Sequence, residues 1–281
     1  MMKICGKSAV KNSLFFTALI LTSLSAYGNK LAIVIDDIGY RQKEDSAIYS
    51  LSKEISVAII PSAPYAKQRN QQAKQQGRDV LIHLPMQAKN GMKLEEGGIY
   101  LGMSQLEVDQ RVDRAKQIVS YAIGLNNHTG SAATADTPLM EKLMVALQRQ
   151  HLFFLDSRTI GSSVAGKIAK QRGISALDRH IFLDDSDKFA DVQTQFQRAI
   201  QYARRHGTAI VIGHPRPNTV AVLQAGLRHL PKDIQLVSIG SLWRKEKVVP
   251  PQPFILLFSD QPAPTSVPPF DHVPSLRGMP Q

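Results

Sequence analysis

The chain is almost without cysteine, because its 281 residues contain a single one, Cys5. One thiol cannot form a disulfide within the chain, and it cannot supply the paired cysteines of a thiolate metal site. Cys5 also precedes the apolar run of the N-terminus, whereas a lipoprotein needs a cysteine directly after that run. A catalytic metal in the rest of the chain would therefore depend on histidine and carboxylate ligands.

The N-terminal apolar run, SLFFTALILTSLSA, is shorter than the roughly 20 residues that a membrane-spanning helix needs. Lys3, Lys7 and Lys11 precede this run, and AYG at its end (Ala26 to Gly28) supplies small residues suited to cleavage. This three-part pattern is typical of a secretory signal peptide. We predict a cleaved signal peptide over residues 1–28, export to the periplasm or the cell exterior, and no membrane span after cleavage. A membrane anchor is the alternative.

Acidic residues are in the minority, with 23 Asp and Glu against 34 Lys and Arg. Removal of the signal peptide takes away three lysines and no acids, so the formal net charge changes from +11 to +8. A basic surface suits anionic partners such as nucleic acid, a cell-wall polymer or lipid headgroups. Export and the lack of a motif that combines aromatic and basic residues argue against nucleic acid, and a solvated basic surface remains the simplest interpretation.

Residues 29–245 alternate short apolar runs with helix-like segments and are predicted to form one α/β domain. Continuous apolar runs, as opposed to alternating ones, are typical of parallel strands covered on both faces. The segment SQLE, Ser104 to Glu107, forms a capping box that predicts the start of a helix. Repeated units of this kind favour a closed barrel or a doubly wound sheet. The predicted strands are LAIVI, ISVAII, DVLIHL, AIGLNN, LFFLD, HIFLD, TAIVIG and IQLVSIG.

The last part of the chain has a different composition, since nine of its sixteen prolines lie within residues 250–281. Such a density of proline is incompatible with ordinary helix or sheet. We predict an extended or disordered proline-rich tail over residues 246–281. The apolar segment FILLF within it is a candidate for docking on the domain or on an envelope protein.

Polar residues with useful chemistry follow most of the predicted strands. In parallel α/β folds, binding and catalysis take place at the carboxyl ends of the strands. The first strand ends in a doubled carboxylate, which a helix N-cap and a solvated acid would also explain. The residues at these exits are Asp36, Asp37, His83, Asn126, Asn127, His128, Asp156, Asp184, Asp185 and His214.

Three of the eight histidines, His83, His128 and His214, lie at strand exits. One such histidine alone is usually structural, but three together with several acids favour a site. Two imidazoles and one carboxylate form a common hydrolytic metal site, in which the metal polarises a carbonyl and activates water. A cation would also relieve the repulsion between the adjacent carboxylates Asp36 and Asp37.

The motifs IDDIG, HLPM, NNHTGS, FLDSRT and GHP occur in this order, and with them the chain resembles the divergent polysaccharide deacetylases. The resemblance covers most of residues 30–243. It implies a distorted (β/α) barrel with about seven strands and metal-dependent removal of acetyl groups from a glycan. It also implies that Asp36 is the general base, that Asp37 and His83 bind the metal, and that His214 is the general acid.

One departure from the better-known members of the superfamily concerns the second histidine ligand after the third strand. This chain has Gln87 at that place. We expect His128, from the next strand, to complete the metal site with Asp37 and His83.

Four further residues at the strand exits are candidates for supporting roles. Asp156 and Arg158 are predicted to orient a ligand or the base, with a loop salt bridge as the alternative. Asn127 and Ser131 are predicted to hydrogen-bond to a sugar or an acyl oxyanion, with an ordinary turn as the alternative.

The leading functional prediction is an exported hydrolase that cleaves a C–N amide bond, but no peptide bond, on an acetylated amino sugar or polymer. Zinc is the expected cofactor, and cobalt, manganese or iron are its possible substitutes. The first alternative is a non-catalytic module that binds a glycan or an envelope protein on a deacetylase-like barrel, since fold does not guarantee chemistry. The second is a metal-dependent phosphoesterase.

Overall fold

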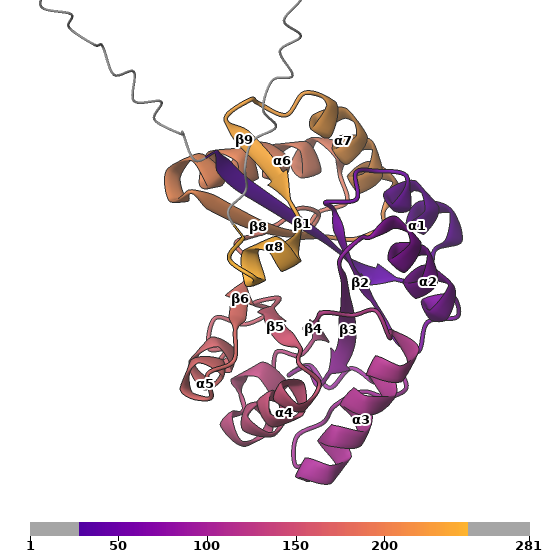
Figure 1. The fold of residues 1–281 in the computed structure, drawn as a ribbon, viewed down its shortest axis with the longest axis vertical. Helices are drawn as coiled ribbons and strands as arrows, with labels where there is room; N and C mark the ends of the chain where they lie inside the picture. Colours follow the sequence, from indigo (N-terminus) through magenta and orange to yellow (C-terminus); the bar gives the residue numbers. More distant parts are fainter. Residues whose placement is uncertain (1–27, 247–281) are drawn as a thin grey trace, which may run out of the picture. The chain divides into compact units, whose positions relative to one another are not determined.

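The computed structural model describes residues 28–246. The predicted signal peptide and the predicted proline-rich tail lie outside this range, apart from Gly28 and Glu246. In the described part, a sheet of nine strands occupies the centre and helices cover its outer side (Figure 1). None of the helices in this part is long and apolar enough to cross a bilayer.

All strand pairs of the sheet are parallel. The strands are β1 Asn29–Ile38, β2 Ser56–Ile59, β3 Val80–Met86, β4 Gly124–Thr129, β5 Phe153–Asp156, β6 Ala176–Asp178, β7 Ile181–Phe182, β8 Thr208–Gly213 and β9 Ile234–Val237. Their order is β6-β5-β4-β3-β2-β1-β8-β7, and β9 pairs with the first residues of β1. The apolar run of β1, residues 31–35, is fully buried, as expected for a parallel strand covered on both faces.

The helices follow the strands along the chain. They are α1 Gln42–Tyr49, α2 Ala66–Gln76, α3 Gln105–Ile118, α4 Thr137–Arg149, α5 Ala165–Gln171, α6 Phe189–His206, α7 Pro217–Arg228 and α8 Ile239–Trp243, with the 3-10 helix η1 Ala133–Ala135. The predicted capping box is confirmed, because the Ser104 side chain accepts from the Glu107 N–H and the Glu107 side chain accepts from the Ser104 N–H. Val108, Val112 and Ala115 form the buried face of α3.

The sheet curls into an open half-barrel, in agreement with the predicted α/β barrel class. Its two end strands, β6 and β7, are separated in the chain by Arg179 and His180 alone. Three Cα steps span at most about 11 Å, so the two ends of the sheet lie near each other. Among residues 28–246, no ladder joins β6 to β7, and the barrel stays open at this point.

Two differences from the sequence prediction concern β6 and β9. β6 was not predicted, because Ala176–Asp178 is short and only partly buried and therefore lacks an apolar run. The predicted strand IQLVSIG ends at Val237, because Ser238 is the N-cap of α8 and its side chain accepts a hydrogen bond from the Ser241 N–H. A serine followed by a helical turn is an ordinary N-cap.

The side chain of His180, which lies between β6 and β7 in the chain, hydrogen-bonds to the backbone of β8. Its ring Nδ1 accepts a hydrogen bond of 2.9 Å from the Ile210 N–H, and its ring stacks on Tyr202 at 4.7 Å between centroids. Burial lowers the pKa of His180 from its ordinary 6.5, and the charges of His206 and Arg179 act in the same direction against that of Asp178. The folded protein therefore favours the neutral imidazole.

We expect this arrangement to make stability depend on pH. Because the folded pKa of His180 lies below the unfolded value of 6.5, its contribution is complete above pH 6.5 and is lost as the pH falls toward the folded pKa. In His180→Gln, the free energy of unfolding should fall less between pH 8 and pH 5 than in the wild type, as measured by urea denaturation. His229→Gln, a change at an exposed histidine, is the control and should retain the wild-type slope.

Candidate metal centre

Near its carboxyl end, strand β1 carries two adjacent carboxylates, Asp36 and Asp37, that reach the same side of the sheet. In a regular strand, successive side chains point to opposite faces. Here Asp37 has a φ of +56°, and the register with β2 shifts between Ile35 and Ile38. As a result, Asp36 Oδ2 and Asp37 Oδ1 lie 3.5 Å and 3.3 Å from the same atom, His83 Nε2. A positive φ at a residue other than glycine is sparsely populated and is concentrated at functional sites.

The turn after Asp37 is held by Gly39 and a buried ion pair. Gly39 has a φ of +118°, and a Cβ at this position would lie 2.7 Å from the Cβ of Ala63. The Gly39 N–H donates to the Asp45 carboxylate at 3.0 Å, and Arg69 Nε donates to the same oxygen at 3.3 Å. The side chains of Asp45 and Arg69 are almost completely buried, so their ion pair restrains the turn that follows Asp37.

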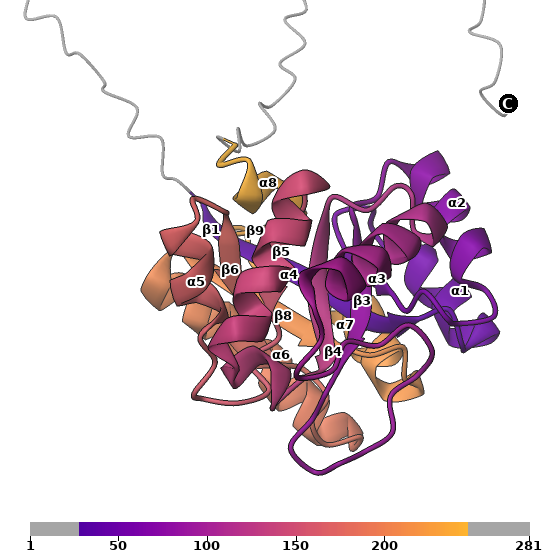
Figure 2. The same cartoon turned by 90° about the horizontal axis from the view of Figure 1, so that it is seen from below.

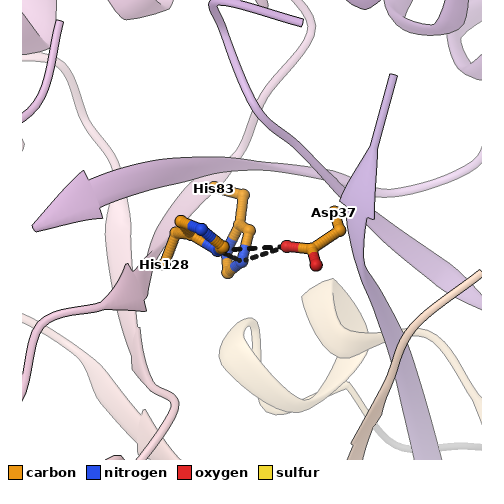
Figure 3. A group of neighbouring side chains, drawn as sticks. All are labelled: Asp37, His83 and His128. Atoms are coloured by element: carbon orange, nitrogen blue, oxygen red, sulfur yellow. Dashed lines mark hydrogen bonds and ion pairs between the residues drawn. The ribbon is translucent and has the colours of Figure 1, made fainter. Parts of the chain in front are cut away.

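Three side chains from three strands converge at this end of the sheet (Figure 3). Asp37 extends from β1, His83 from β3 and His128 from β4. Asp37 Oδ1 lies 3.0 Å from His128 Nδ1 and 3.3 Å from His83 Nε2. The two imidazole nitrogens are 3.1 Å apart. We refer to Asp37, His83 and His128 as the ligand triad.

The geometry of the ligand triad fits a small divalent cation. Around tetrahedral zinc with bonds of about 2.0–2.2 Å, two ligand atoms lie about 3.3–3.6 Å apart. The three observed separations, 3.0, 3.1 and 3.3 Å, are within a few tenths of an ångström of this range. Apart from its contacts with the two imidazoles, the buried Asp37 Oδ1 has no hydrogen-bond partner among the described residues, which suits an oxygen that binds a cation. Two imidazoles and one carboxylate are a zinc ligand set that leaves a coordination position open.

Each imidazole of the triad has a partner for its second nitrogen. His83 Nδ1 donates to Asn126 Oδ1 at 2.9 Å, and Asn126 Nδ2 donates to Asp36 Oδ1 at 2.8 Å. His128 Nε2 lies 3.3 Å from Glu95 Oε1. Metal-binding histidines characteristically use their second nitrogen in this way. Asn126 was expected at a strand exit without a role, and Glu95 was not predicted because it lies in a loop with no motif.

Burial and the charges of the cluster shift the pKa values of its members in different directions. Burial raises the pKa of Asp36 above its usual range, against the lowering effect of His83 and His214. Burial also acts to raise the pKa of Asp37, but its contacts with His128 and His83 outweigh this and hold it well below the usual range. For His83, burial lowers the pKa and the two aspartates more than compensate, so the net shift is upward.

His214 approaches the triad from the other side. It follows β8, and its Nε2 lies 4.0 Å from Asp37 Oδ2. Its Nδ1 donates to Asp184 Oδ1 at 2.8 Å, while Asp184 Oδ2 accepts from the His214 N–H and from the Thr219 hydroxyl. Burial lowers the pKa of His214, but the bond to Asp184 and the charges of Asp36 and Asp37 raise it above its ordinary value.

The other residues predicted to support the site lie around its edge. The side chain of Asn127 is buried. Its amide oxygen accepts from the Ser157 N–H and its amide nitrogen donates to the Thr129 carbonyl, so the side chain connects two loops. Ser131 Oγ accepts from the Lys89 N–H. None of these bonds is directed at the triad.

Asp156 and Arg158 form a local unit at the end of β5. Asp156 accepts hydrogen bonds from the Arg158 N–H at 2.7 Å and from the Ser163 hydroxyl at 2.6 Å. The Arg158 guanidinium is 3.8 Å from the carboxylate. Asp156 thus organises its own loop, and a role of Asp156 and Arg158 in orienting a ligand or the base stays a prediction.

Gln87 belongs to the framework of the loop after β3. Its backbone carbonyl accepts from the N–H groups of Ala132 and Ala133, and its side-chain oxygen accepts from the Leu101 N–H at 2.8 Å. Gln87, which replaces the second histidine of the better-known superfamily members, therefore stabilises this loop. His128 supplies the third atom of the triad.

Two known proteins are similar to this chain in sequence. A protein of Haemophilus influenzae is 66% identical over 280 residues, which cover all of both chains. The protein YibQ of Escherichia coli is 43% identical over 238 residues, which cover 85% of this chain and 75% of that one. Both of these relatives carry the description uncharacterized protein.

Two solved structures have the same fold. A crystal structure of an uncharacterized protein from Agrobacterium tumefaciens matches with a TM-score of 0.72 and 22% identity, over 78% of this chain and 90% of that one. A lactam utilization protein from Thermus thermophilus matches with a TM-score of 0.52 and 13% identity, over 75% of this chain and 100% of that one. At these identities the likeness concerns the fold alone.

The sequence profile described as divergent polysaccharide deacetylase matches residues 33–243. This range runs from within β1 to the last residue of α8 and includes the ligand triad, Asp36 and His214. The chain belongs to the divergent polysaccharide deacetylase family.

Proposed function

We propose that this protein is a metal-dependent hydrolase that removes acetyl groups from an envelope or extracellular polysaccharide by cleaving a C–N amide bond. The observation that carries the proposal is the convergence of three ligand atoms on one point, with a buried carboxylate and an aspartate-paired histidine beside them. Family membership supports the class of reaction.

In this proposal Asp37, His83 and His128 hold a divalent cation, with zinc as the first choice. When bound, the cation supplies a Lewis acid that polarises the acyl oxygen and makes water a better nucleophile near neutral pH. Because the triad provides three ligands, a coordination position is left for water or substrate.

Asp36 has the environment of a general base. Its carboxylate is buried next to the triad, and the amide of Asn126 holds Oδ1 so that Oδ2 faces His83. A pKa raised by burial makes Asp36 a stronger proton acceptor than an exposed aspartate. In the proposed reaction, Asp36 takes the proton of the attacking water.

His214 has the environment of a general acid. Asp184 accepts its Nδ1–H, which orients the ring and leaves Nε2 toward the triad. The carboxylates around it raise its pKa, so a larger fraction is protonated at neutral pH. In the proposed reaction, His214 gives this proton to the departing amine.

Acetate release tests the proposal directly. The mature protein, loaded with zinc, is incubated with N-acetylated fragments of cell wall and exopolysaccharide, and the acetate and the new amine are quantified. The proposal predicts that both form in equal amounts. Treatment with a chelator should abolish the release, and restored zinc should recover it. Release of phosphate from phosphorylated fragments, with no acetate, would replace the proposal by the phosphoesterase alternative.

A non-catalytic glycan-binding or envelope-protein-binding module is the remaining alternative. The missing second histidine at position 87 and the proline-rich tail favour this module, whereas the contact of His128 with Asp37 and His83 favours the hydrolase. Binding of the acetylated fragments by metal-loaded protein without any product would favour the module over the hydrolase.

Export to the periplasm or the cell exterior is part of the proposal and rests on the N-terminal sequence alone. The same holds for an envelope protein partner of the proline-rich tail.

A further inference from the structure

The connection between β3 and α3 is a long loop of residues 87–104, the extended purple segment in Figure 2. Its base is closed by the hydrogen bonds from the Gln87 N–H to the Ile99 carbonyl and from the Ile99 N–H to the Pro85 carbonyl, both 2.9 Å. The part between them, residues 88–98, is anchored by the side chain of Leu94, which is 6% exposed. Glu95 follows this anchor directly, so the position of its backbone is restrained.

Glu95 faces the back of one ligand of the triad. Its Oε1 lies 3.3 Å from His128 Nε2, on the side of the ring opposite to the Nδ1 that meets Asp37 and His83. A neutral imidazole carries one N–H, so a histidine that binds a cation through Nδ1 must hold its proton on Nε2. Glu95 is placed to accept that proton in a hydrogen bond.

With a cation bound by the triad, the two imidazoles would hold opposite tautomers, and each has a different partner for its N–H. His83 directs Nε2 at the site and donates from Nδ1 to Asn126, which is fully buried in the neighbouring strand. His128 directs Nδ1 at the site and is supported by a charged residue on a loop, whose side chain is 34% exposed. The first support belongs to the rigid sheet, and the second can change with the loop.

We propose that Glu95 is a positioning residue of the metal site, which selects the Nε2–H tautomer of His128 and couples the loop of residues 88–98 to metal binding. This inference rests on the proposed metal site and goes beyond it, because no ligand role is assigned to the loop. A carboxylate behind a ligand histidine fixes the ring and raises its basicity, and loss of such a partner typically costs about 10–100-fold in metal affinity.

Zinc affinity of the full mature chain, measured by competition with a chromogenic chelator, tests the proposal without any substrate. Glu95→Ala should weaken zinc binding about 10–100-fold. Glu95→Gln keeps an acceptor oxygen but loses the charge and should lie between Glu95→Ala and the wild type. Glu96→Ala is the matched control, because this neighbouring carboxylate lines a separate cavity with Arg111 and Arg114 and should leave the affinity unchanged.

Two further measurements separate positioning from a general effect on folding. The ¹⁵N chemical shifts of His128 should report the Nε2–H tautomer in the wild type and a mixture of tautomers in Glu95→Ala. Amide hydrogen exchange in residues 88–98 should slow upon zinc addition in the wild type and in Glu96→Ala, but not in Glu95→Ala.

The outcomes distinguish this inference from the proposed function. If the wild type binds zinc and Glu95→Ala binds it equally well, Glu95 is not a positioning residue, while the metal site stands. If the wild type binds no zinc, both the metal site and the role of Glu95 are refuted.

Discussion

Asp36→Asn is expected to lower kcat for acetate release by about 10²–10⁴-fold, the usual contribution of a general base. Asparagine has nearly the same shape as aspartate, and its side-chain oxygen can still accept the bond from Asn126 Nδ2. The amide cannot accept a proton at neutral pH, so the proton of the attacking water has no acceptor next to His83. Bound zinc should remain near the wild-type amount, because the ligand triad is intact.

The combination of lost turnover and retained metal is the diagnostic result for Asp36. The measurement pairs kcat and KM for acetate release with metal analysis of the same preparations. Wild-type turnover in Asp36→Asn would remove Asp36 from the role of base. Loss of zinc in this variant would show that Asp36 helps to hold the cation, contrary to the division of roles between the two aspartates.

Asp37→Ala and His83→Ala are each expected to weaken zinc binding by more than about 100-fold, which exceeds the effect of losing a partner behind a ligand. Each substitution removes one of three ligand atoms, and the remaining two cannot complete the site. Asp37→Ala also removes the buried oxygen Oδ1 that contacts both imidazoles. Acetate release should fall to the background level in both variants because the metal is lost.

The control for these ligand variants is Asp185→Asn, which changes an exposed carboxylate that follows β7 and leaves the triad intact. Its zinc content, measured by inductively coupled plasma mass spectrometry after dialysis, should equal that of the wild type. Stoichiometric zinc in both Asp37→Ala and His83→Ala would refute the ligand triad and with it the hydrolase proposal. Circular dichroism of each variant checks that the fold is retained.

Much of the fold can be predicted from local patterns of residues. The apolar run of β1 and the capping box at Ser104 are encoded within a few positions, since burial and helix capping act over short distances. β6 escaped prediction because three partly buried residues carry no pattern, and their pairing with β5 depends on the curl of the whole sheet. The segment IQLVSIG was predicted too long because apolar residues continue past the Ser238 cap.

The candidate site was predictable as a set of residue types at strand ends. Parallel strands deliver their carboxyl ends to one edge, so Asp37, His83 and His128 were expected to be neighbours, and the structure brings them together. The supporting partners were not predictable in the same way. Glu95 and Asp184 contact histidines that are 33 and 30 positions away in the chain, and such contacts depend on how loops fold over the sheet.

Short-range information in the chain thus suffices for the α/β class, for most strands and for the candidate ligands, because periodicity, capping and strand polarity are local properties. The orientation of those ligands arises only in the folded molecule. The positive φ of Asp37 turns two adjacent carboxylates to one side, and Asn126 and Glu95 lie next to the second nitrogens of the two imidazoles. These features require elements distant in the sequence to pack against one another, and only their packing can hold the strained backbone and the buried charges in place.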